Sequence, residues 1–560
     1  MLMVSAGVQN IIWLIWNPDC RRTIMGLFLN SKLPYEQYKS SKTAKYYVDK
    51  SELLVELFDS IGTESPYICI TRPRRFGKSV AANMIAAFFG KGAEAEHLFC
   101  DLAVEKNESY KKHLNSHNVI YIDFSIEPEC CSSYHSYIMR ILDGIKTELW
   151  EAYSELSLNQ VQSLWDILAV ICQKTGDKFI FVIDEWDAPF HLSYITEQEQ
   201  QAYLRMLRSL LKGQAYVELA YMTGILPIAK YSDGSELNMF LEYSMASSEK
   251  YSRYFGFLDA EVDFLFEIYK NITSEPRITR DDLRIWYDGY YTASEQRIYN
   301  PRSIVSALKD NQLRNYWTSS GTYDSIFGYI KDNIEDVQDD LALMFAGEAV
   351  SADVMEYAAS NMQLTTKDEI YSAMVVYGLL TYHDGCVLIP NKELMKSYAA
   401  MMKKEISLGY IYQLANASNQ MLKATLTGDT SKMIEILEYA HNTESPILSY
   451  NSEIELTAVV NLVYLSARDQ YHMEREDKAG EGYVDFIFYP VRKNADGIIL
   501  ELKVDASPEE AIEQIKEKKY SLRFKGKLGE TPKYTGQILA VGISYNRKTK
   551  RHYCKVEVLK

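Results

Sequence analysis

Two hydrophobic patterns alternate along the first half of the chain. Four short runs are almost continuously apolar, which is typical of strands buried on both faces of a parallel sheet. The stretches between them, such as residues 80–89 and 203–212, repeat apolar positions at helical spacing and predict helices. This alternation predicts an α/β domain with helices on both faces of its sheet. The predicted strands are Tyr67–Thr71, Val119–Phe124, Phe179–Asp184 and Val217–Thr223.

The pattern changes twice in the second half. From about residue 260 to 430 it is mostly helical, and Asn300-Pro301 is typical of a helix start, with Asn as the cap and Pro in the first turn. From about residue 445 a small α/β pattern follows, with helices at 453–466 and 508–520, strands at 483–489 and 498–504, and a final hairpin at 537–544 and 552–559.

These patterns divide the chain into four regions. We expect an N-terminal extension, because the short apolar run 11–16 has no preceding Lys or Arg and does not predict a signal peptide. Met25 is then a candidate for the true start of the protein. The predicted regions are the extension 1–24, the α/β domain 25–320, a helical connecting region 321–444 and the small α/β domain 445–560.

Composition narrows the class of protein. The chain has 560 residues, 47% of them hydrophobic and 24% charged, which excludes a mostly disordered protein. Its eight cysteines form no CxxC pair, which favours reduced thiols over a disulfide framework or a zinc site. No apolar run reaches the roughly 18–20 residues of a membrane span. We therefore expect a cytoplasmic globular protein.

Charge is distributed unevenly. The whole chain has a net charge of −16, whereas residues 511–560 carry thirteen Lys or Arg and four Glu, a net charge of +9. A C-terminal region that faces a polyanion and an ordinary solvated surface both explain this excess.

A candidate phosphate-binding loop follows the first predicted strand. Gly77-Lys78-Ser79 ends this loop and opens a helix, so backbone N–H groups would point at phosphate oxygens. We expect Lys78 to reach the β- and γ-phosphates and the Ser79 hydroxyl to ligate Mg²⁺. The strict motif requires Gly at position 72, where this chain has Arg. The predicted cofactor-binding loop residues are Arg74, Arg75, Gly77, Lys78 and Ser79.

A matching acidic pair follows the third predicted strand. The apolar run 179–183 leads directly into Asp184-Glu185, the Walker B pattern. Asp184 would hold Mg²⁺, and Glu185 would orient and deprotonate the attacking water. A solvated strand end is the alternative. Thr223, which ends another buried strand, is a candidate sensor of the γ-phosphate.

Four strings in order resemble a known family. ITRPRRFGKS, FVIDEWDAP, YMTGILPIAK and WYDGYY…YNPRSI resemble the bacterial AAA-ATPase-like family of the P-loop AAA+ class, over roughly residues 25–320. In that family Arg is usual at the position of Arg72. The resemblance implies ATP binding at Lys78 and Ser79, with hydrolysis assisted by Asp184 and Glu185. Arg205 and Arg208 are candidates for an arginine finger by position alone, and a solvated helix face is the favoured interpretation of both.

A second candidate site lies near the C-terminus. Glu501 and Lys503 are two residues apart, so on a strand their side chains share one face. A hairpin through the turn at 492–497 would bring Asp485 beside Glu501. Two carboxylates and a Lys on neighbouring strands suit a hard divalent cation that lowers the pKa of bound water. The alternative is a surface strand that carries Glu and Lys.

This constellation resembles the PD-(D/E)XK nuclease superfamily, over about residues 445–560. The resemblance implies that Asp485 and Glu501 bind metal and that Lys503 is catalytic. It also implies that Glu453 completes the acidic set, with Glu455 as the competing choice. Gln514 and Tyr520 match the helix that supports such a site.

The sequence thus predicts a bacterial ATPase fused to a Mg²⁺-dependent nuclease. ATP would gate the cleavage of nucleic acid, DNA rather than RNA, and the protein could form a homo-oligomer. The alternative is an ATP-dependent signalling, scaffold or remodelling protein whose C-terminal domain binds nucleic acid or protein without cutting.

Overall fold

The structure is a computed structural model. It describes residues 26–128, 131–158, 161–228, 236–317, 334–345, 347–354, 366–404, 409–441, 453–479, 482–492, 494–525 and 536–559. The predicted extension 1–24 lies outside these residues. The chain divides into two compact units, one formed by Met1–Trp317 and Asp353–Gly385, the other by Thr318–Ala352 and Cys386–Lys560. The predicted connecting region 321–444 is thus divided between the two units.

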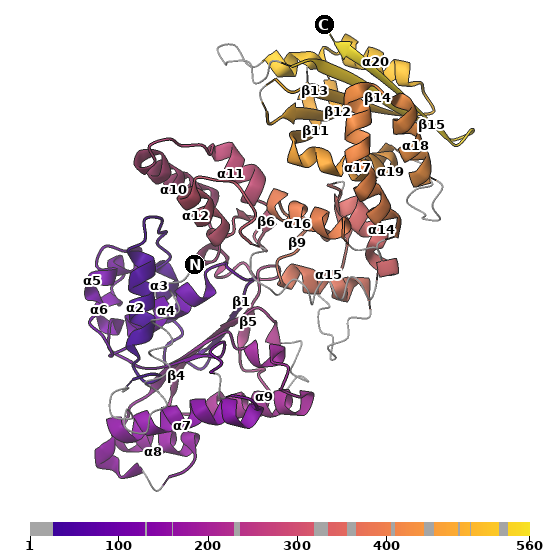
Figure 1. Ribbon diagram of the computed structural model, residues 1–560. Coiled ribbons are helices and arrows are strands. Elements are labelled where there is room, and N and C mark those ends of the chain that lie inside the picture. Colours follow the sequence, from indigo (N-terminus) through magenta and orange to yellow (C-terminus); the bar gives the residue numbers. More distant parts are fainter. Residues whose placement is uncertain are drawn as a thin grey trace. The chain divides into compact units, whose positions relative to one another are not determined.

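A five-stranded sheet organises the first unit (Figure 1). All its strand pairs are parallel, in the order β2-β3-β4-β1-β5. Every strand predicted from the sequence is present, within one residue at either end, because each is buried on both faces. The strands are β1 (Tyr67–Thr71), β2 (Asn118–Asp123), β3 (Phe179–Asp184), β4 (Val217–Gly224) and β5 (Leu241–Tyr243).

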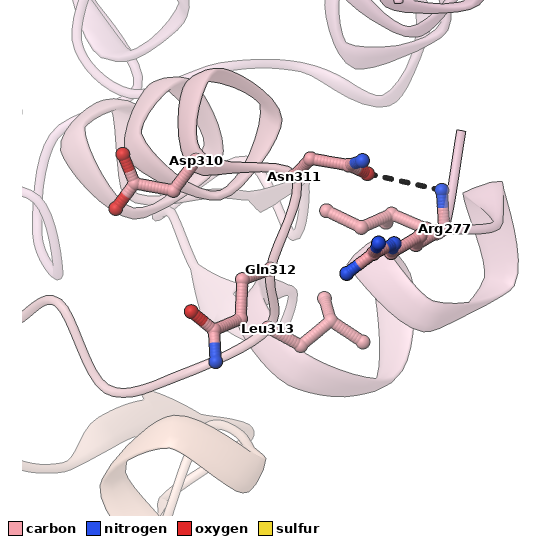
Figure 2. A pocket seen from close by; sticks show the side chains of 6 residues that line it. Arg277, Asp310, Asn311, Gln312 and Leu313 are labelled. Atoms are coloured by element: carbon pink, nitrogen blue, oxygen red, sulfur yellow. Dashed lines mark hydrogen bonds between the residues drawn. The ribbon is translucent and has the colours of Figure 1, made fainter. Parts of the chain in front are cut away.

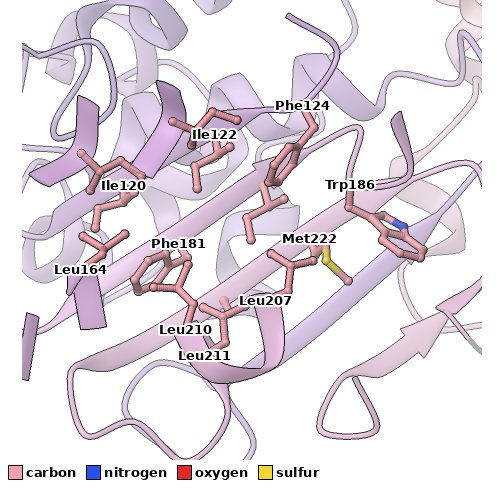
Figure 3. Close-up of a cluster of buried hydrophobic side chains, with 14 of the residues drawn as sticks. Ile120, Ile122, Phe124, Leu164, Phe181, Trp186, Leu207, Leu210, Leu211 and Met222 are labelled. Carbon is pink, nitrogen blue, oxygen red and sulfur yellow. The ribbon is translucent and has the colours of Figure 1, made fainter. Parts of the chain in front are cut away.

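Helices cover both faces of this sheet, as the sequence predicts. On one face, side chains from α7 (Tyr134–Ala152), α8 (Leu164–Thr175) and α9 (Glu197–Leu211) pack against strand residues such as Ile120 and Phe181 (Figure 3). On the other face, α4 (Lys78–Phe89) packs against Ile68, Ile70 and Val182. The apolar residues of each strand thus divide between two cores, which holds the strand ends in fixed positions.

The remainder of the first unit is mostly helical. Asn300 caps α12, because its Oδ1 accepts hydrogen bonds from Arg302 N at 3.0 Å and Ser303 N at 3.2 Å, as predicted. Tyr290 OH donates to Gly378 O at 3.0 Å, which joins the segment 353–385 to this unit. The other elements are α2 (Lys32–Lys42), α3 (Glu52–Phe58), α5 (Glu96–Phe99), α6 (Tyr110–His113), α10 (Asp259–Ile272), α11 (Arg280–Tyr287), α12 (Pro301–Asp310), α15 (Lys367–Val376), β6 (Tyr290–Tyr291), β7 (Arg297–Ile298) and β9 (Thr381–His383).

A mixed five-stranded sheet organises the second unit (Figure 1). Its order is β11-β12-β13-β14-β15, and the β13–β14 pair is parallel whereas the other pairs are antiparallel. The parallel pair is joined through a crossover helix, α20, whose Ile512 and Ile515 pack against Ile499 and Ala540. The strands are β11 (Tyr471–Ala479), β12 (Gly482–Pro490), β13 (Gly497–Val504), β14 (Ile538–Asn546) and β15 (Arg551–Leu559), and α20 is Pro508–Glu517.

Further helices complete the second unit. Of these, α18 contacts β15 and α19 contacts β13. They are α14 (Ile334–Phe345), α16 (Lys392–Met402), α17 (Gly409–Thr427), α18 (Thr430–His441) and α19 (Glu453–Val463), together with the short strands β8 (Val350–Ser351) and β10 (Cys386–Leu388).

Some boundaries differ from the sequence prediction. Helix α9 begins at Glu197 and not near Tyr203, because Thr196 forms a capping box with Glu199. Helix α20 ends at Glu517, since Tyr520 belongs to a following 3₁₀ turn. Strand β11 was not predicted at all.

The described residues include six cysteines and most of the helices. Cys69, Cys100, Cys131, Cys172, Cys386 and Cys554 form no disulfide bond in the described part of the structure. Within the described segments, no helix has both the length and the apolar character needed to cross a lipid bilayer.

Candidate active sites

The phosphate-binding loop connects β1 to α4. Its last residue, Gly77, caps α4 with φ +96°, a left-handed conformation that favours glycine. A Cβ built on Gly77 would meet nothing within 4 Å, so space is open beside the loop at the helix N-terminus. The unpaired N–H groups of such a terminus attract anions. The loop therefore fits a phosphate group at the predicted position.

Lys78 lies between the loop and the acidic pair. Its side chain is 3% exposed, and Nζ lies 3.8 Å from Glu185 Oε1. Nζ also donates a hydrogen bond to Pro73 O at 3.2 Å. The neighbouring Ser79 hydroxyl interacts with the Asp184 carboxylate and opposes the rise in its pKa. The structure thus brings Lys78, Ser79, Asp184 and Glu185 together, as the sequence predicts.

Buried carboxylates gather at the carboxyl ends of β2 and β3. Asp123 and Asp184 are register partners, and Asp184 is 1% exposed. The pKa of Asp184 is raised to about 7, mainly by burial and also by the charges of Asp123 and Glu185, whereas Ser79 and Lys78 oppose the shift. An ionised Asp184 is therefore costly unless a cation is near, which suits a residue that ligates Mg²⁺.

Asp187 belongs to this site, although the sequence analysis did not select it. It is 1% exposed, and its Oδ2 accepts hydrogen bonds from Ile225 N at 3.1 Å and Leu226 N at 2.9 Å. It thereby ties the segment after β3 to the loop after β4. Burial and the Glu185 charge raise its pKa to about 6. The signal in the sequence was a third acid in Asp-Glu-Trp-Asp, directly after an apolar strand.

The loop arginines bind backbone carbonyl groups. Arg72 Nη1 donates to Thr71 O and Tyr243 O, both at 2.7 Å, which joins β1 to β5. Its guanidinium is 1% exposed and lies 5.2 Å from the centroid of the Phe255 ring. Arg75 Nη1 donates to Trp317 O at 2.8 Å and also to Tyr316 O. Arg75 thus joins the phosphate-binding loop to the segment that follows α12.

Three other predicted residues have clear positions. Arg74 is partly exposed, and its carbonyl accepts a hydrogen bond from Asn300 Nδ2 at 3.4 Å. Thr223 is fully buried, and its hydroxyl donates to Ile70 O at 2.8 Å, so this proton is engaged by β1. Arg205 and Arg208 are exposed on α9, in agreement with the solvated helix face favoured by the sequence.

The second site lies where β12 and β13 separate. Phe486 pairs with Leu500, and the same register places Asp485 opposite Glu501. Asp485 Oδ2 accepts a hydrogen bond from Leu502 N at 2.7 Å, which fixes its carboxylate beside β13. Lys503 Nζ donates to Glu501 Oε1 at 3.2 Å. The hairpin predicted from the sequence therefore brings Asp485, Glu501 and Lys503 together.

Glu501 has an incompletely satisfied carboxylate. Its side chain is 3% exposed, and Oε2 has no hydrogen bond of normal geometry to any described residue. The pKa of Glu501 is raised to about 7, mainly by burial and also by the charge of Asp485, whereas Lys503 opposes the shift. A buried oxygen without a donor, beside a second carboxylate, is a suitable ligand for a divalent cation.

Residues of α20 and β14 lie next to the residues of this site. Gln514 Nε2 donates to Glu501 Oε1 and lies 3.4 Å from Tyr520 OH, so the two supporting residues named from the sequence do adjoin the site. Ser544 on β14 is the register partner of Lys503, and its buried hydroxyl has no partner among the described residues. Ser544 was missed because only strand pairing places it there.

The proposed acidic partners on α19 are described only as backbone. Glu453 and Glu455 lie in the first turn of α19, but their side chains fall outside the described part of the structure. Among the side chains that are described, no group of three or more His, Cys, Asp or Glu is arranged to hold a metal ion. The described metal-binding candidates at this site are thus Asp485 and Glu501.

A further pocket in the first unit is lined by none of the candidate site residues. Arg277, Ile278 and residues 310–313 line a cavity of about 340 Å³ beside the end of α12 (Figure 2). Asn311 Oδ1 accepts hydrogen bonds from Arg277 N at 3.0 Å and from Tyr269 OH. The Asn311 side-chain oxygen is therefore already used to join the end of α12 to Tyr269 and Arg277.

Comparison with protein families agrees with this geometry. Residues 36–232 match a family model described as predicted AAA-ATPase, and residues 455–553 match the PD-(D/E)XK nuclease superfamily. Both resemblances seen in the sequence are thereby confirmed. The chain carries a P-loop ATPase-like domain and a C-terminal domain of the PD-(D/E)XK superfamily. The first match supports ATP binding.

Individual relatives are distant. An uncharacterized protein in the vnfD 5′ region of Azotobacter chroococcum mcd 1 is 26% identical over 299 residues, which cover 50% of this chain and 51% of that protein. The chain thus matches about half the length of this curated relative. Among solved structures, a Walker-type ATPase of Pyrococcus abyssi is 12% identical and covers 62% of this chain and 93% of its own, with a TM-score of 0.34. The ORC2 protein of Aeropyrum pernix is 12% identical and covers 68% and 97%, with a TM-score of 0.26.

Proposed function

We propose that the protein binds and hydrolyses ATP in its first unit and cleaves phosphodiester bonds of nucleic acid in its second. One observation carries the second half of this proposal. Asp485, Glu501 and Lys503 converge where β12 and β13 separate, and Glu501 keeps one buried oxygen without a hydrogen bond of normal geometry. A buried carboxylate oxygen without a donor is costly, and a bound cation would offset that cost.

In the first unit, the roles follow from position. The N-terminus of α4 and Lys78 would hold the phosphates, while Ser79 and Asp184 would hold Mg²⁺. Glu185 lies 3.8 Å from Lys78 Nζ through Oε1, and its side chain is 27% exposed, so it can reach a water molecule outside the loop. Glu185 is therefore the candidate base for hydrolysis, with Asp187 as the residue that positions the neighbouring loop.

In the second unit, Asp485 and Glu501 would hold the divalent cation. When bound, this cation would lower the pKa of a water molecule and neutralise charge on the phosphate. Lys503 is 22% exposed and already lies on the face of Glu501, so it can orient a nucleophile or contact the phosphate. Gln514 would hold the Glu501 carboxylate in position. Glu453 or Glu455 would complete the acidic set.

The decisive experiment is a cleavage assay on single- and double-stranded DNA and RNA, with Mg²⁺ or Mn²⁺, with and without ATP. We expect Asp485→Ala and Lys503→Ala each to lower the cleavage rate at least a hundredfold, because each removes a group that acts on the reacting phosphate. A matched control is Glu513→Gln, an exposed carboxylate of α20. If cleavage survives both substitutions, the assignment is wrong.

ATP binding is tested separately. Lys78→Ala should abolish ATP binding, measured by calorimetry, since it removes the cation that faces the β- and γ-phosphates. If ATP gates cleavage, this variant should also lose the ATP dependence of the nuclease. DNA-stimulated ATPase activity without cleavage by the wild type would instead favour a remodelling protein that binds nucleic acid without cutting.

A further inference from the structure

A strongly basic turn connects β14 to β15. Asn546 pairs with Arg551, and Arg547-Lys548-Thr549-Lys550 forms the connection between them. Four of the five residues 547–551 are therefore cationic, and all five are exposed. No other run of five in residues 511–560 carries as high a net positive charge. We refer to residues 546–551 as the basic hairpin.

The basic hairpin lies at the carboxyl end of β13, the end of the strand that carries the candidate catalytic lysine. Because β13 and β14 are parallel, Lys503 pairs with Ser544 and Val504 with Tyr545. The turn begins two residues later, at Arg547. At about 3.3 Å per residue, the hairpin starts roughly 10 Å beyond Lys503 along the sheet. A polynucleotide held at Lys503 would extend over this distance.

The backbone of the basic hairpin is fixed by hydrogen bonds. Asn546 Oδ1 accepts from Lys548 N at 3.1 Å and Thr549 N at 2.9 Å. Asp505 Oδ1 accepts from Arg547 N at 2.8 Å, and its Oδ2 contacts Arg547 Nε at 2.6 Å. Since Asp505 follows Lys503 by two residues, these bonds attach the turn to the strand that carries the candidate catalytic groups.

One of the four cations is neutralised and three are not. Arg547 pairs with Asp505, whereas Lys548, Lys550 and Arg551 have no acidic partner within ion-pair distance in the described segments. Like charges gathered on a fixed turn repel one another, so this arrangement contributes nothing to folding stability. It does suit a ligand with regularly spaced negative charges.

We propose that the basic hairpin binds the phosphate backbone of the nucleic-acid substrate through Lys548, Lys550 and Arg551. This inference rests on the proposed nuclease function and assigns the substrate contact outside the catalytic site. A two-stranded ribbon has the width to enter the major groove of B-DNA, and a turn at its end can reach phosphates on either side. Such contacts position the duplex and are independent of its sequence.

The chain offers a matched control at the opposite end of β13, near the start of that strand. Arg492 lies in the connection that precedes β13, while Lys518 and Lys519 follow the end of the crossover helix α20. All three are exposed. Each set contains one Arg and two Lys, and each includes one Lys with positive φ, Lys550 at +54° and Lys519 at +55°. The two triple substitutions therefore remove equal charge with similar backbone consequences.

The test measures binding of the full-length protein to a labelled duplex DNA of random sequence, in EDTA, by fluorescence anisotropy over a salt series. The hairpin variant carries Lys548→Gln, Lys550→Gln and Arg551→Gln, and the control carries Arg492→Gln, Lys518→Gln and Lys519→Gln. For B-DNA the logarithm of the binding constant falls with the logarithm of salt by about 0.9 per phosphate contact, so the hairpin variant should lose about 2.7 from this slope. It should bind at least about tenfold more weakly near 0.1 M salt, whereas the control should keep the wild-type slope.

The slope separates a phosphate contact from a structural effect, because a folding defect lowers the active fraction and leaves the slope unchanged. If the triple variant fails to fold, each single substitution still predicts a slope change of about 0.9. An unchanged slope in the hairpin variants, or an equal change in the control, overturns the inference. Absence of DNA binding by the wild type at any salt would instead overturn the proposed nuclease function.

Discussion

At the scale of single residues, each candidate site contains a carboxylate whose pKa is raised by burial to near neutral pH. The pKa values of Asp184 and Glu501 are both raised to about 7, in each case mainly by burial. Each residue has a second carboxylate beside it, Asp123 in one case and Asp485 in the other. Each is therefore costly for folding in the absence of a cation, and each is a suitable ligand in its presence.

Glu501 should make the metal-free protein less stable as pH rises. Between its ordinary value of 4.5 and about 7, the unfolded chain loses the Glu501 proton first, so the free energy of unfolding falls through this window. Glu501→Gln removes the effect, and its stability relative to the wild type should rise by up to about 3 kcal/mol from pH 5 to pH 8. Urea unfolding in EDTA measures this difference.

The same experiment with a divalent cation provides the contrast. Mn²⁺ at pH 8 should stabilise the wild type more than Glu501→Gln, because the variant lacks one of the two ionised carboxylates that would bind the ion in the second unit. The exposed Glu513→Gln variant should follow the wild type throughout. Parallel stability curves for all three proteins would show that Glu501 is not the group that titrates.

Asp187 should be important for the first unit as a hydrogen-bond acceptor. Asp187→Ala leaves the N–H groups of Ile225 and Leu226 buried without a partner and should lower the free energy of unfolding by about 2–4 kcal/mol. Asp187→Asn keeps an oxygen at this position and should lose less than half as much. Equal losses in the two variants would mean that the charge, and not the acceptor, is what the loop requires.

Residue identities were predictable where the chain itself brings them together. Lys78 and Ser79 are adjacent, Asp184 and Glu185 are adjacent, and Glu501 and Lys503 share a strand face by their spacing. Asp123 and Ser544 were missed because strand register places them, and register leaves no local pattern. Asp187 was missed although it is the third acid of Asp-Glu-Trp-Asp, because its role depends on loop packing against Ile225 and Leu226.

At the scale of elements, the crossover helix α20 controls the geometry of the second site. It passes over β14 at Gly542, where a Cβ would lie 2.3 Å from Pro508 O and 3.1 Å from Ala511 Cβ. The helix therefore approaches the sheet more closely than any side chain would permit. This approach brings Gln514 into contact with Glu501.

Gly542→Ala should displace α20 and impair cleavage. The backbone of Pro508 cannot yield without moving the start of the helix, so overpacking should cost about 1–3 kcal/mol of unfolding free energy. Cleavage should fall although no catalytic group has changed, and ATP hydrolysis should remain at the wild-type level. A variant that cleaves normally would show that α20 can shift without disturbing Gln514.

Elements buried on both faces were the ones that the sequence predicted well. Strands β1 and β3 were predicted with correct bounds, because they are continuous apolar runs. Strand β11 was missed because it lies at the edge of its sheet and contains Glu474, Arg475, Glu476, Asp477 and Lys478 in succession. Edge strands tolerate charged residues, so their hydrophobic pattern is weak. Strand β5 has only three residues, too few to show a period.

At the scale of the whole molecule, the two units have separate hydrophobic cores, so their activities should be separable by substitution. Asp485→Ala should leave ATP hydrolysis intact, and Lys78→Ala should leave binding of duplex DNA in EDTA intact, since each substituted residue belongs to one unit. Both variants are compared with the wild type by ATPase assay and anisotropy. Loss of both functions in either variant would indicate obligatory coupling between the units.

The path of the chain between the units has a consequence for its genetics. The polypeptide leaves the first unit after Trp317, returns at Asp353 and leaves again after Gly385. A stop codon or a protease cut at any single point between these positions thus deprives one half of part of its own fold, such as the Gly378 carbonyl that Tyr290 holds. The two halves are interleaved along the gene, and neither can be inherited, lost or exchanged as one uninterrupted segment.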